Sequence, residues 1–295
     1  MLILVTGAAG FIGSATAASF AELGFDVVAV DNFSPYYSID LKRLRIETLL
    51  KNPKIKFVEC DLSNRYEVVD LFKSYGFESV IHLAAQAGVR LQISDWDKYV
   101  RDNLLGFSNI LNMSAEASVH NFIYASSSSV YGNSNESYFR EKELEPNPVS
   151  FYGVTKRTNE ILASSVSRLT GLKTRGLRFF TVYGPWGRPD MVYFRMVTSA
   201  ITKVPFDFYG DGKIERDFTY VSDVVDLATK LLYELETREI GFADTVNIGG
   251  GKPKSINDIL EIIQDNVGLS VPFKDRKSTR LNSSHVSESR MPSSA

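Results

Sequence analysis

The chain has 295 residues, of which 44% are hydrophobic and 23% are charged, and its formal net charge at neutral pH is −2. This composition is typical of a globular protein with a full hydrophobic core, and it excludes a basic footprint for nucleic acid. The apolar runs are too short for a membrane span and no secretory signal precedes the first predicted strand, so we expect a cytoplasmic protein with no membrane segment. A single cysteine, Cys60, and the isolated His82 and His120 predict neither a disulfide scaffold nor a metal site.

A glycine-rich segment follows the first predicted strand. Residues 2–6 form a short apolar run, as in a strand buried on both faces of a parallel sheet. Glycines then recur at Gly7, Gly10 and Gly13, where they allow a tight turn and let the backbone approach a pyrophosphate at a helix N-terminus. A turn without a ligand uses similar residues, but this one lies between a strand and an amphipathic segment that runs to Leu23. The pattern therefore predicts a dinucleotide-binding turn.

Asp31 lies at the end of the second predicted strand, residues 25–30. A carboxylate at this distance from the glycines accepts hydrogen bonds from the adenosine ribose of a dinucleotide. It would repel the 2′-phosphate of NADP, and although Asn32 follows it, no arginine stands beside it in the sequence. We therefore expect NAD as the cofactor.

Strands and helices continue to alternate through the first two thirds of the chain. This rhythm predicts an α/β fold, a doubly wound parallel Rossmann sheet whose ligand site lies beyond the carboxyl ends of the strands. Beyond those already named, we expect helices at 41–50, at 96–117 and from 151 to about 169, and a further helix that begins after a cap at Ser63. We expect strands at 55–58, 80–83, 122–125 and 177–184.

Tyr152 and Lys156 are four residues apart on the helix predicted from residue 151. On a helix this spacing directs the phenol and the ammonium group into the same space, and a nearby cation favours the phenolate. Such a pair is more often a half-buried ring beside a surface charge. Here, however, the serine run 126–129 ends the fifth strand, and its hydroxyls open onto the same crevice, so we expect an acid/base centre.

The domain organisation follows from where the alternation loosens. We expect an NAD-binding domain at 1–180, to which a strand near 245–249 returns, and a smaller C-terminal substrate lobe at 181–274 that is incomplete at its end. Residues 275–295 are rich in serine and lack the upstream periodicity. They fit a disordered native tail or the translation of a sequencing-library adapter, and we favour the non-native tail.

Taken together, these motifs resemble the extended short-chain dehydrogenase/reductase superfamily. More narrowly, the stretches HLAAQAGVR, YASSSSVYG and LRFFTVYGPWGRPDM resemble UDP-glucuronate 4-epimerases, from Met1 to about Lys274. The resemblance implies that hydride leaves carbon 4 of a UDP-sugar for NAD and returns to the opposite face of a 4-keto intermediate. UDP-glucuronate and UDP-galacturonate would thereby interconvert. It also implies a homodimer through the helices at 96–117 and 151–169.

The resemblance further implies a role for each site residue. Tyr152 would be the acid/base, Lys156 would lower its pKa and hold the nicotinamide ribose, and Ser127 would bond the reacting oxygen. The other implied cofactor contacts are Gly7, Gly10, Phe11, Ile12, Gly13, Asp31, Asn32, Asp61, Leu62, Leu83, Ala84, Ala85, Asn103 and Phe179. The implied substrate contacts, beside Ser127, are Arg90, Ser128, Ser129, Thr181, Arg188 and Arg216, with no metal.

Which sugar is used depends on Arg188 and on the serines. A ketone at carbon 4 makes a uronate a β-keto acid that loses carbon dioxide readily, and the fork of Arg188 is suited to holding its carboxylate. Related dehydratases and decarboxylases carry acidic residues where Ser128 and Ser129 stand, which favours an epimerase. The alternatives are a UDP-glucose 4-epimerase, a dehydratase or decarboxylase on the same fold, and a non-catalytic NAD-binding protein or inactive fragment.

Overall fold

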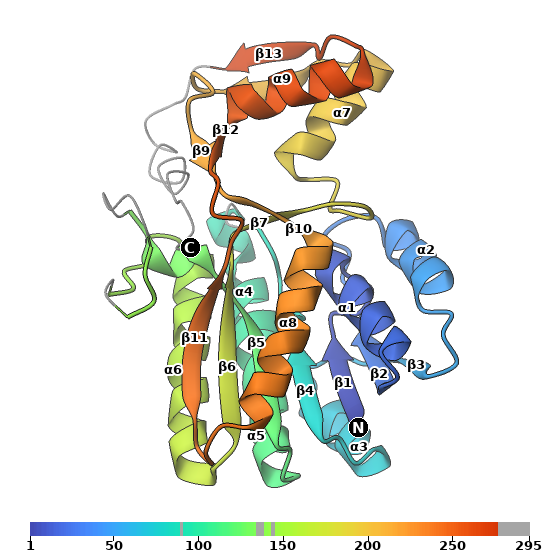
Figure 1. The fold of residues 1–295 in the computed structure, drawn as a ribbon, viewed down its shortest axis with the longest axis vertical. Coiled ribbons are helices and arrows are strands. Elements are labelled where there is room, and N and C mark those ends of the chain that lie inside the picture. The colour runs from blue at the N-terminus through green and yellow to red at the C-terminus, as the bar shows by residue number, and fades with distance from the viewer. Residues whose placement is uncertain (89–90, 134–138, 143–144, 277–295) are drawn as a thin grey trace.

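A parallel seven-stranded sheet forms the centre of the computed structural model, which describes residues 1–88, 91–133, 139–142 and 145–276 (Figure 1). The strand order is β11-β6-β5-β4-β1-β2-β3, and every pair in it is parallel. Because the order reverses between β1 and β4, a crevice opens there at the carboxyl ends. The predicted doubly wound fold is confirmed, with strands β1 (Leu2–Thr6), β2 (Asp26–Asp31), β3 (Ile55–Glu59), β4 (Ser79–His82), β5 (Asn121–Ser127), β6 (Lys173–Phe179) and β11 (Ala243–Ile248).

Helices cover both faces of this sheet (Figure 1). The strand interiors are almost wholly buried and apolar, so each face needs an apolar cover. One face packs on α1 (Phe11–Glu22), α2 (Ile39–Leu49) and α8 (Val221–Glu236). The other packs on α3 (Arg65–Ser74), α5 (Gly106–Glu116) and α6 (Phe151–Thr170), and the short α4 (Trp96–Tyr99) packs on α6. No helix in the described ranges combines the length and apolar character needed to cross a membrane.

A smaller lobe lies beyond the carboxyl ends of the sheet, at the top of Figure 1. It has its own apolar core around Met196, Phe206 and Phe208. The C-terminal strand of the lobe includes Asp275 and Arg276, the first two residues of the segment expected to be non-native. The lobe and its connection to the sheet comprise β7 (Thr181–Tyr183), α7 (Val192–Thr202), β8 (Phe206–Tyr209), β9 (Glu215–Arg216), β10 (Phe218–Tyr220), β12 (Lys254–Ser255), α9 (Ile256–Val267) and β13 (Phe273–Arg276).

The single strand expected at 177–184 is wrong, because the chain leaves the central sheet at Phe180. The backbone N–H of Phe180 still donates to Ile248 of β11, whereas that of Thr181 donates to Asp217 beside β10. The change of partner divides the segment into β6 and β7. This division directs the following loop over the crevice.

Two helix details also differ from expectation. The cap of α3 is Asn64, whose side chain accepts from the N–H of Tyr66, because the hydroxyl of Ser63 instead donates to Asp61 at 2.8 Å. The helix expected at 96–117 contains a π-helical segment at Val100–Leu105 between α4 and α5.

Candidate active site

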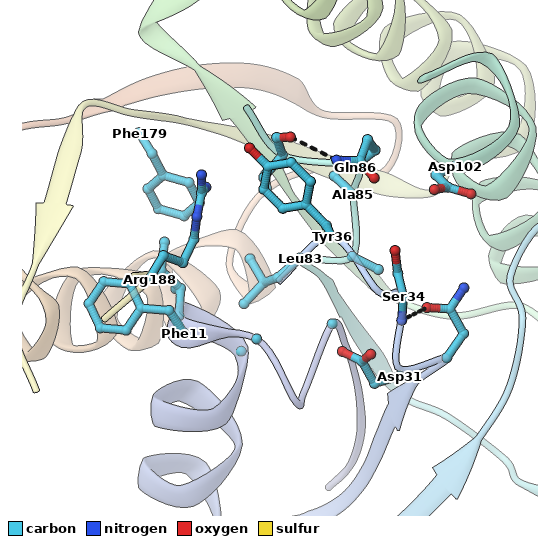
Figure 2. A pocket seen from close by; sticks show the side chains of 18 of the residues that line it. Phe11, Asp31, Ser34, Tyr36, Leu83, Ala85, Gln86, Asp102, Phe179 and Arg188 are labelled. Atoms are coloured by element: carbon cyan, nitrogen blue, oxygen red, sulfur yellow. Dashed lines mark hydrogen bonds between the residues drawn. The ribbon is translucent and has the colours of Figure 1, made fainter. Parts of the chain in front are cut away.

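A cavity of about 270 Å³ lies at the carboxyl ends of the central strands. Figure 2 shows Asp31 and Ser34 at one end of it, and Phe11, Phe179 and Arg188 at the other. The first end is formed by β2 and the second by α1, β6 and the loop after β7. The cavity therefore extends from the second strand, across the switch point, to the base of the lobe.

The glycine turn fits a pyrophosphate. Gly7 has a left-handed backbone with φ of 70°, and a Cβ there would lie 2.7 Å from the backbone nitrogen of Ala84. A Cβ on Gly13 would lie 2.0 Å from the carbonyl oxygen of Gly7, so the turn can be this tight only with glycine. Gly10 and Gly13 line the cavity at the N-terminus of α1, where free N–H groups and the helix dipole favour an anion.

Asp31 is anchored from both sides. Its Oδ2 accepts from the N–H of Ala9 at 3.1 Å and its Oδ1 from that of Phe33 at 2.9 Å. The ammonium group of Lys42 lies 3.7 Å from Oδ1, and both side chains are buried. Burial lowers the pKa of Lys42, while the carboxylate of Asp31 opposes that shift. The structure thus places a lysine where the sequence shows no neighbouring cation.

Lys156 is held beneath Tyr152 by the end of β5. The hydroxyl of Ser150 accepts from the N–H of Gly153 at 3.0 Å and caps α6, which sets both side chains on one face. The Nζ of Lys156 donates to the carbonyl of Ala125 at 2.9 Å and lies 5.8 Å from the ring centre of Tyr152. Burial lowers the pKa of Lys156 to about 8.

The pKa of Tyr152 is raised from its ordinary value, because burial outweighs the positive charge of Arg188 and a hydrogen bond with Ser127 that oppose it. The expected net lowering is therefore not what this geometry produces. The cation that acts against burial is Arg188, which also lines the cavity, and not Lys156. Tyr152 is nevertheless in the first turn of α6, where the helix dipole favours a phenolate.

Arg188 holds a carboxylate from its own loop. Its Nε donates to Oδ1 of Asp190 at 3.0 Å and its Nη2 to Oδ2 at 2.5 Å. The guanidinium also lies 5.8 Å from the ring centre of Tyr36, whose hydroxyl donates to Asp190 at 3.4 Å. This bidentate pair is the geometry with which arginine binds carboxylates in general.

Most predicted cofactor residues line the cavity, but Asn103 is not among them. Its Oδ1 accepts from the N–H of Gln86 at 2.7 Å, and its Nδ2 donates to the hydroxyl of Thr155 at 3.2 Å. Asn103 thus ties the loop after β4 to α6 from behind. The lining residues include Gly7, Gly10, Phe11, Ile12, Gly13, Asp31, Asn32, Asp61, Leu62, Leu83, Ala84, Ala85, Tyr152, Lys156 and Phe179.

Of the predicted substrate residues, Ser127 and Arg188 line the cavity. The described side chains that do not line it are Ser128, Ser129, Thr181 and Arg216. The N–H of Ser129 donates to the hydroxyl of Ser127 at 3.1 Å in the turn that ends β5, and Arg216 lies in β9 of the lobe. Arg90 lies outside the described residues.

Several lining residues were not among the predicted contacts. Most come from the segment before α2 and its first turn, from the ends of β3, β4 and β5, and from the start of the lobe, and these segments meet at the cavity only through tertiary packing. The serine run 126–129 and the stretch HLAAQAGVR were the local signals for Ser126, Gln86 and Ala87. The residues are Ser34, Tyr36, Tyr37, Lys42, Cys60, Ser63, Gln86, Ala87, Asp102, Ala125, Ser126, Phe180, Val182 and Met191.

The fold and the site define a Rossmann-type dinucleotide-binding protein with a tyrosine–lysine pair over the cofactor cradle. The chain belongs to the NAD dependent epimerase/dehydratase family, whose profile matches residues 3–249. A probable UDP-glucuronate 4-epimerase of Rhizobium meliloti is 36% identical over 282 residues, which are 91% of this chain and 83% of the relative. UDP-glucuronate 4-epimerase 4 of Arabidopsis thaliana is 40% identical and is matched over 62% of its length, against 89% of this chain.

Solved structures agree with this membership. The Bacillus cereus UDP-glucuronic acid 4-epimerase, in complex with UDP-glucuronic acid and NAD, superposes with a TM-score of 0.88 at 33% identity. The match covers 100% of this chain and 90% of that one. The Thermotoga maritima UDP-glucose 4-epimerase, solved with UDP-glucose, has a TM-score of 0.84 at 27% identity over 99% of this chain and 89% of its own.

Proposed function

We propose that this chain is an NAD-dependent isomerase that interconverts UDP-glucuronate and UDP-galacturonate. The observation that carries the proposal is the convergence of Tyr152, Lys156 and Ser127 with Arg188 on one cavity that also contains the glycine turn. The likeness to an epimerase solved with UDP-glucuronic acid and NAD supports it.

The residues present fit NAD. The first turn of α1 would hold the pyrophosphate, Asp31 the adenosine ribose, and Asp61 with Leu62 the adenine, since all of these line the same cavity. When bound, NAD accepts the hydride from carbon 4 of the sugar and returns it. Because the cofactor is regenerated in each turnover, it does not need to exchange with solvent.

Tyr152 is the group that moves the proton. Its Oη would take the proton of the 4-hydroxyl as hydride leaves and give it back when hydride returns. Ser127, which hydrogen-bonds Tyr152, would hold the reacting oxygen. The Nζ of Lys156 lies below the ring of Tyr152 and donates to the carbonyl of Ala125 at the end of β5. From this position it would hold the nicotinamide ribose.

Arg188 would decide what happens to the uronate carboxylate. Its guanidinium binds Asp190 in the bidentate manner that the substrate carboxylate would also use. Holding that carboxylate out of line with the carbon 4 carbonyl would prevent loss of carbon dioxide. Ser127, Ser128 and Ser129 supply no carboxylate for the proton transfers of a dehydratase or decarboxylase.

A product analysis tests the proposal. The purified chain is incubated with NAD and UDP-glucuronate, and the sugar nucleotides are separated and identified by NMR. UDP-galacturonate is expected. A UDP-pentose with carbon dioxide would indicate a decarboxylase, turnover of UDP-glucose alone a neutral-sugar epimerase, and no product from either sugar a binding protein.

The homodimer and the cytoplasmic location remain predictions. The homodimer is supported by apolar side chains that α6 and the helix before it expose to solvent, among them Val100 at 47% and Ile161 at 54%. Exposed apolar groups on adjacent helices are typical of a surface that packs against a second copy.

A further inference from the structure

Arg45 is a fully buried cation outside the chemistry proposed so far. It projects from α2, is 0% exposed, and in the described part of the chain none of its hydrogen-bond partners is a carboxylate. A buried charge of this kind is costly unless every donor is satisfied. The segments that supply the acceptors therefore indicate which parts of the fold Arg45 holds together.

The guanidinium uses all five of its N–H donors. Nε and Nη2 donate to the carbonyl of Trp186 at 3.0 and 2.7 Å, and Nη2 also donates to that of Gly187 at 3.2 Å. Nη1 donates to the carbonyl of Ala9 at 3.0 Å and to the hydroxyl of Tyr37 at 2.6 Å. Ala9 belongs to the glycine turn, while Trp186 and Gly187 directly precede Arg188. One side chain thus joins the glycine turn to the loop that contains Arg188.

The backbone that Arg45 holds is unfavourable by itself. Residues 184–187 form a turn closed by the N–H of Gly187 and the carbonyl of Gly184 at 3.2 Å. Pro185 is at its second position and Trp186, with φ of 62°, at its third, the pattern of a type II turn in which glycine is normally required. A bulky residue keeps a left-handed backbone only where its surroundings enforce it. The bonds from Arg45 to the two carbonyls supply that restraint.

We propose that Arg45 is a positioning residue that fixes the loop of Arg188 to the glycine turn, so that the substrate carboxylate is held at a set place relative to the cofactor. Its effect on the uronate rests on the proposed function, whereas its effect on the loop does not. Tyr36, next to Tyr37, bonds Asp190 and is a second attachment of the same loop. Loss of Arg45 would let the carboxylate turn, and the 4-keto intermediate would then lose carbon dioxide.

Substitution of Arg45 tests this, with Arg175 as the matched control. Arg175 of β6 is also buried, at 1% exposure, but it pairs with Asp244 of β11 and Glu234 of α8 and, among the residues that the structure describes, makes no hydrogen bond to the loop of Arg188. We expect Arg45→Lys and Arg45→Met to lower kcat/KM for UDP-glucuronate by roughly 10- to 100-fold, since a misplacement of about 1 Å has that effect. The loss for UDP-glucose should be smaller, and pentose should appear among the uronate products. The Arg45→Lys variant should not retain wild-type activity, because a single ammonium group cannot donate to all the acceptors that the guanidinium of Arg45 binds.

Hydrogen exchange of residues 184–191, followed by mass spectrometry, gives a readout that needs no activity. Exchange there should be faster in both Arg45 variants and unchanged in Arg175→Lys. Adding Trp186→Gly to Arg45→Lys should restore part of the protection, which keeps the test available if Arg45→Met does not fold. Faster exchange in a protein without epimerase activity would retain the positioning role and remove the substrate assignment. Wild-type exchange in both variants, or equal losses on both sugars without pentose, would overturn the proposal.

Discussion

Lys156, Arg188 and Arg45 are cations beside the cavity that are held by different groups. Lys156 has a backbone carbonyl, Arg188 has the carboxylate of Asp190, and Arg45 has carbonyls and a phenol. A lysine can release its proton when it is buried, whereas an arginine cannot. Because burial lowers the pKa of Lys156 to about 8, its charge changes just above neutral pH.

Lys156→Met should stabilise the protein while removing activity. Because burial lowers the pKa of Lys156 to about 8 from 10.5, the folded state disfavours the charged form. Near pH 7 the variant should be more stable by about 1–3 kcal/mol, after allowing for the lost hydrogen bond. Between about pH 8 and 10.5 the unfolded chain holds a proton that the folded protein has released, so wild-type stability rises with pH. The difference in free energy of unfolding between the variant and the wild type should thus narrow by on the order of 2 kcal/mol from pH 7 to 9.5. Urea unfolding at both pH values measures it, and a constant gap would contradict the burial of a charge.

Arg188→Ala should discriminate between the two sugars. If the guanidinium binds the uronate carboxylate, kcat/KM should fall by roughly 10- to 100-fold for UDP-glucuronate and far less for UDP-glucose. The positive charge also lowers the pKa of Tyr152, so its removal should move the acid limb of the pH–rate profile to higher pH. An equal loss of kcat/KM on both sugars would show that Arg188 does not bind the substrate carboxylate. An unchanged acid limb of the pH–rate profile would show that its charge does not lower the pKa of Tyr152.

At the scale of elements, one buried carboxylate on α6 joins this helix to two strands, by an ion pair to β6 and a hydrogen bond from β5. Glu160, two turns after Tyr152 on α6, accepts from the hydroxyl of Ser126 at 2.6 Å. It also accepts from Arg178 of β6 at 2.8 and 3.0 Å, with both charged side chains 2% exposed. The hydroxyl of Ser126, next to Ser127, is thereby fixed to the helix that carries Tyr152.

Glu160→Ala should destabilise the protein by about 3–5 kcal/mol, because it leaves Arg178 buried without its carboxylate. The double variant Glu160→Met/Arg178→Met should be less destabilised than Glu160→Ala, since it removes both charges. Glu261→Ala, at an exposed position on α9, is the control and should change stability by less than about 0.5 kcal/mol. Thermal unfolding compares them, and a small effect of Glu160→Ala would show that the pair contributes little.

At the scale of the whole molecule, the residues that line the cavity gather at the carboxyl ends of the sheet strands. The lobe lies beyond those ends (Figure 1). On the face of the sheet opposite α1 and α8, α6 and the helical segment before it leave apolar side chains exposed. Such a surface is what packing against a second copy requires.

Ile161→Glu should convert the expected dimer into a monomer, because it places a charge in the apolar face of α6. Leu44→Glu is the matched control, since Leu44 is 47% exposed on α2, which covers the other face of the sheet. Light scattering after size-exclusion chromatography gives the mass of each. A monomeric wild type, or a dimer that survives Ile161→Glu, would refute the helix-pair interface.

The local parts of the fold and site were predictable. Short apolar runs, the glycine spacing and the helical spacing of Tyr152 and Lys156 all act within a few residues, where periodicity and backbone conformation determine the outcome. The division of the strand at Phe180 and the inward turn of Asn103 were not, because each depends on which neighbour offers a hydrogen-bond partner.

The sequence by itself determined the family, the doubly wound sheet and the cofactor cradle, since these depend on patterns within single strand–helix units. Only the tertiary structure decided how the charged groups in and around the cavity are paired. Lys42 beside Asp31, Asp190 on Arg188 and Arg45 beneath Trp186 are contacts across 11, 2 and 141 residues of chain, and even the short one depends on a turn that Arg45 restrains from outside. Electrostatic environment is a property of packing and burial, so it appears only when distant segments meet.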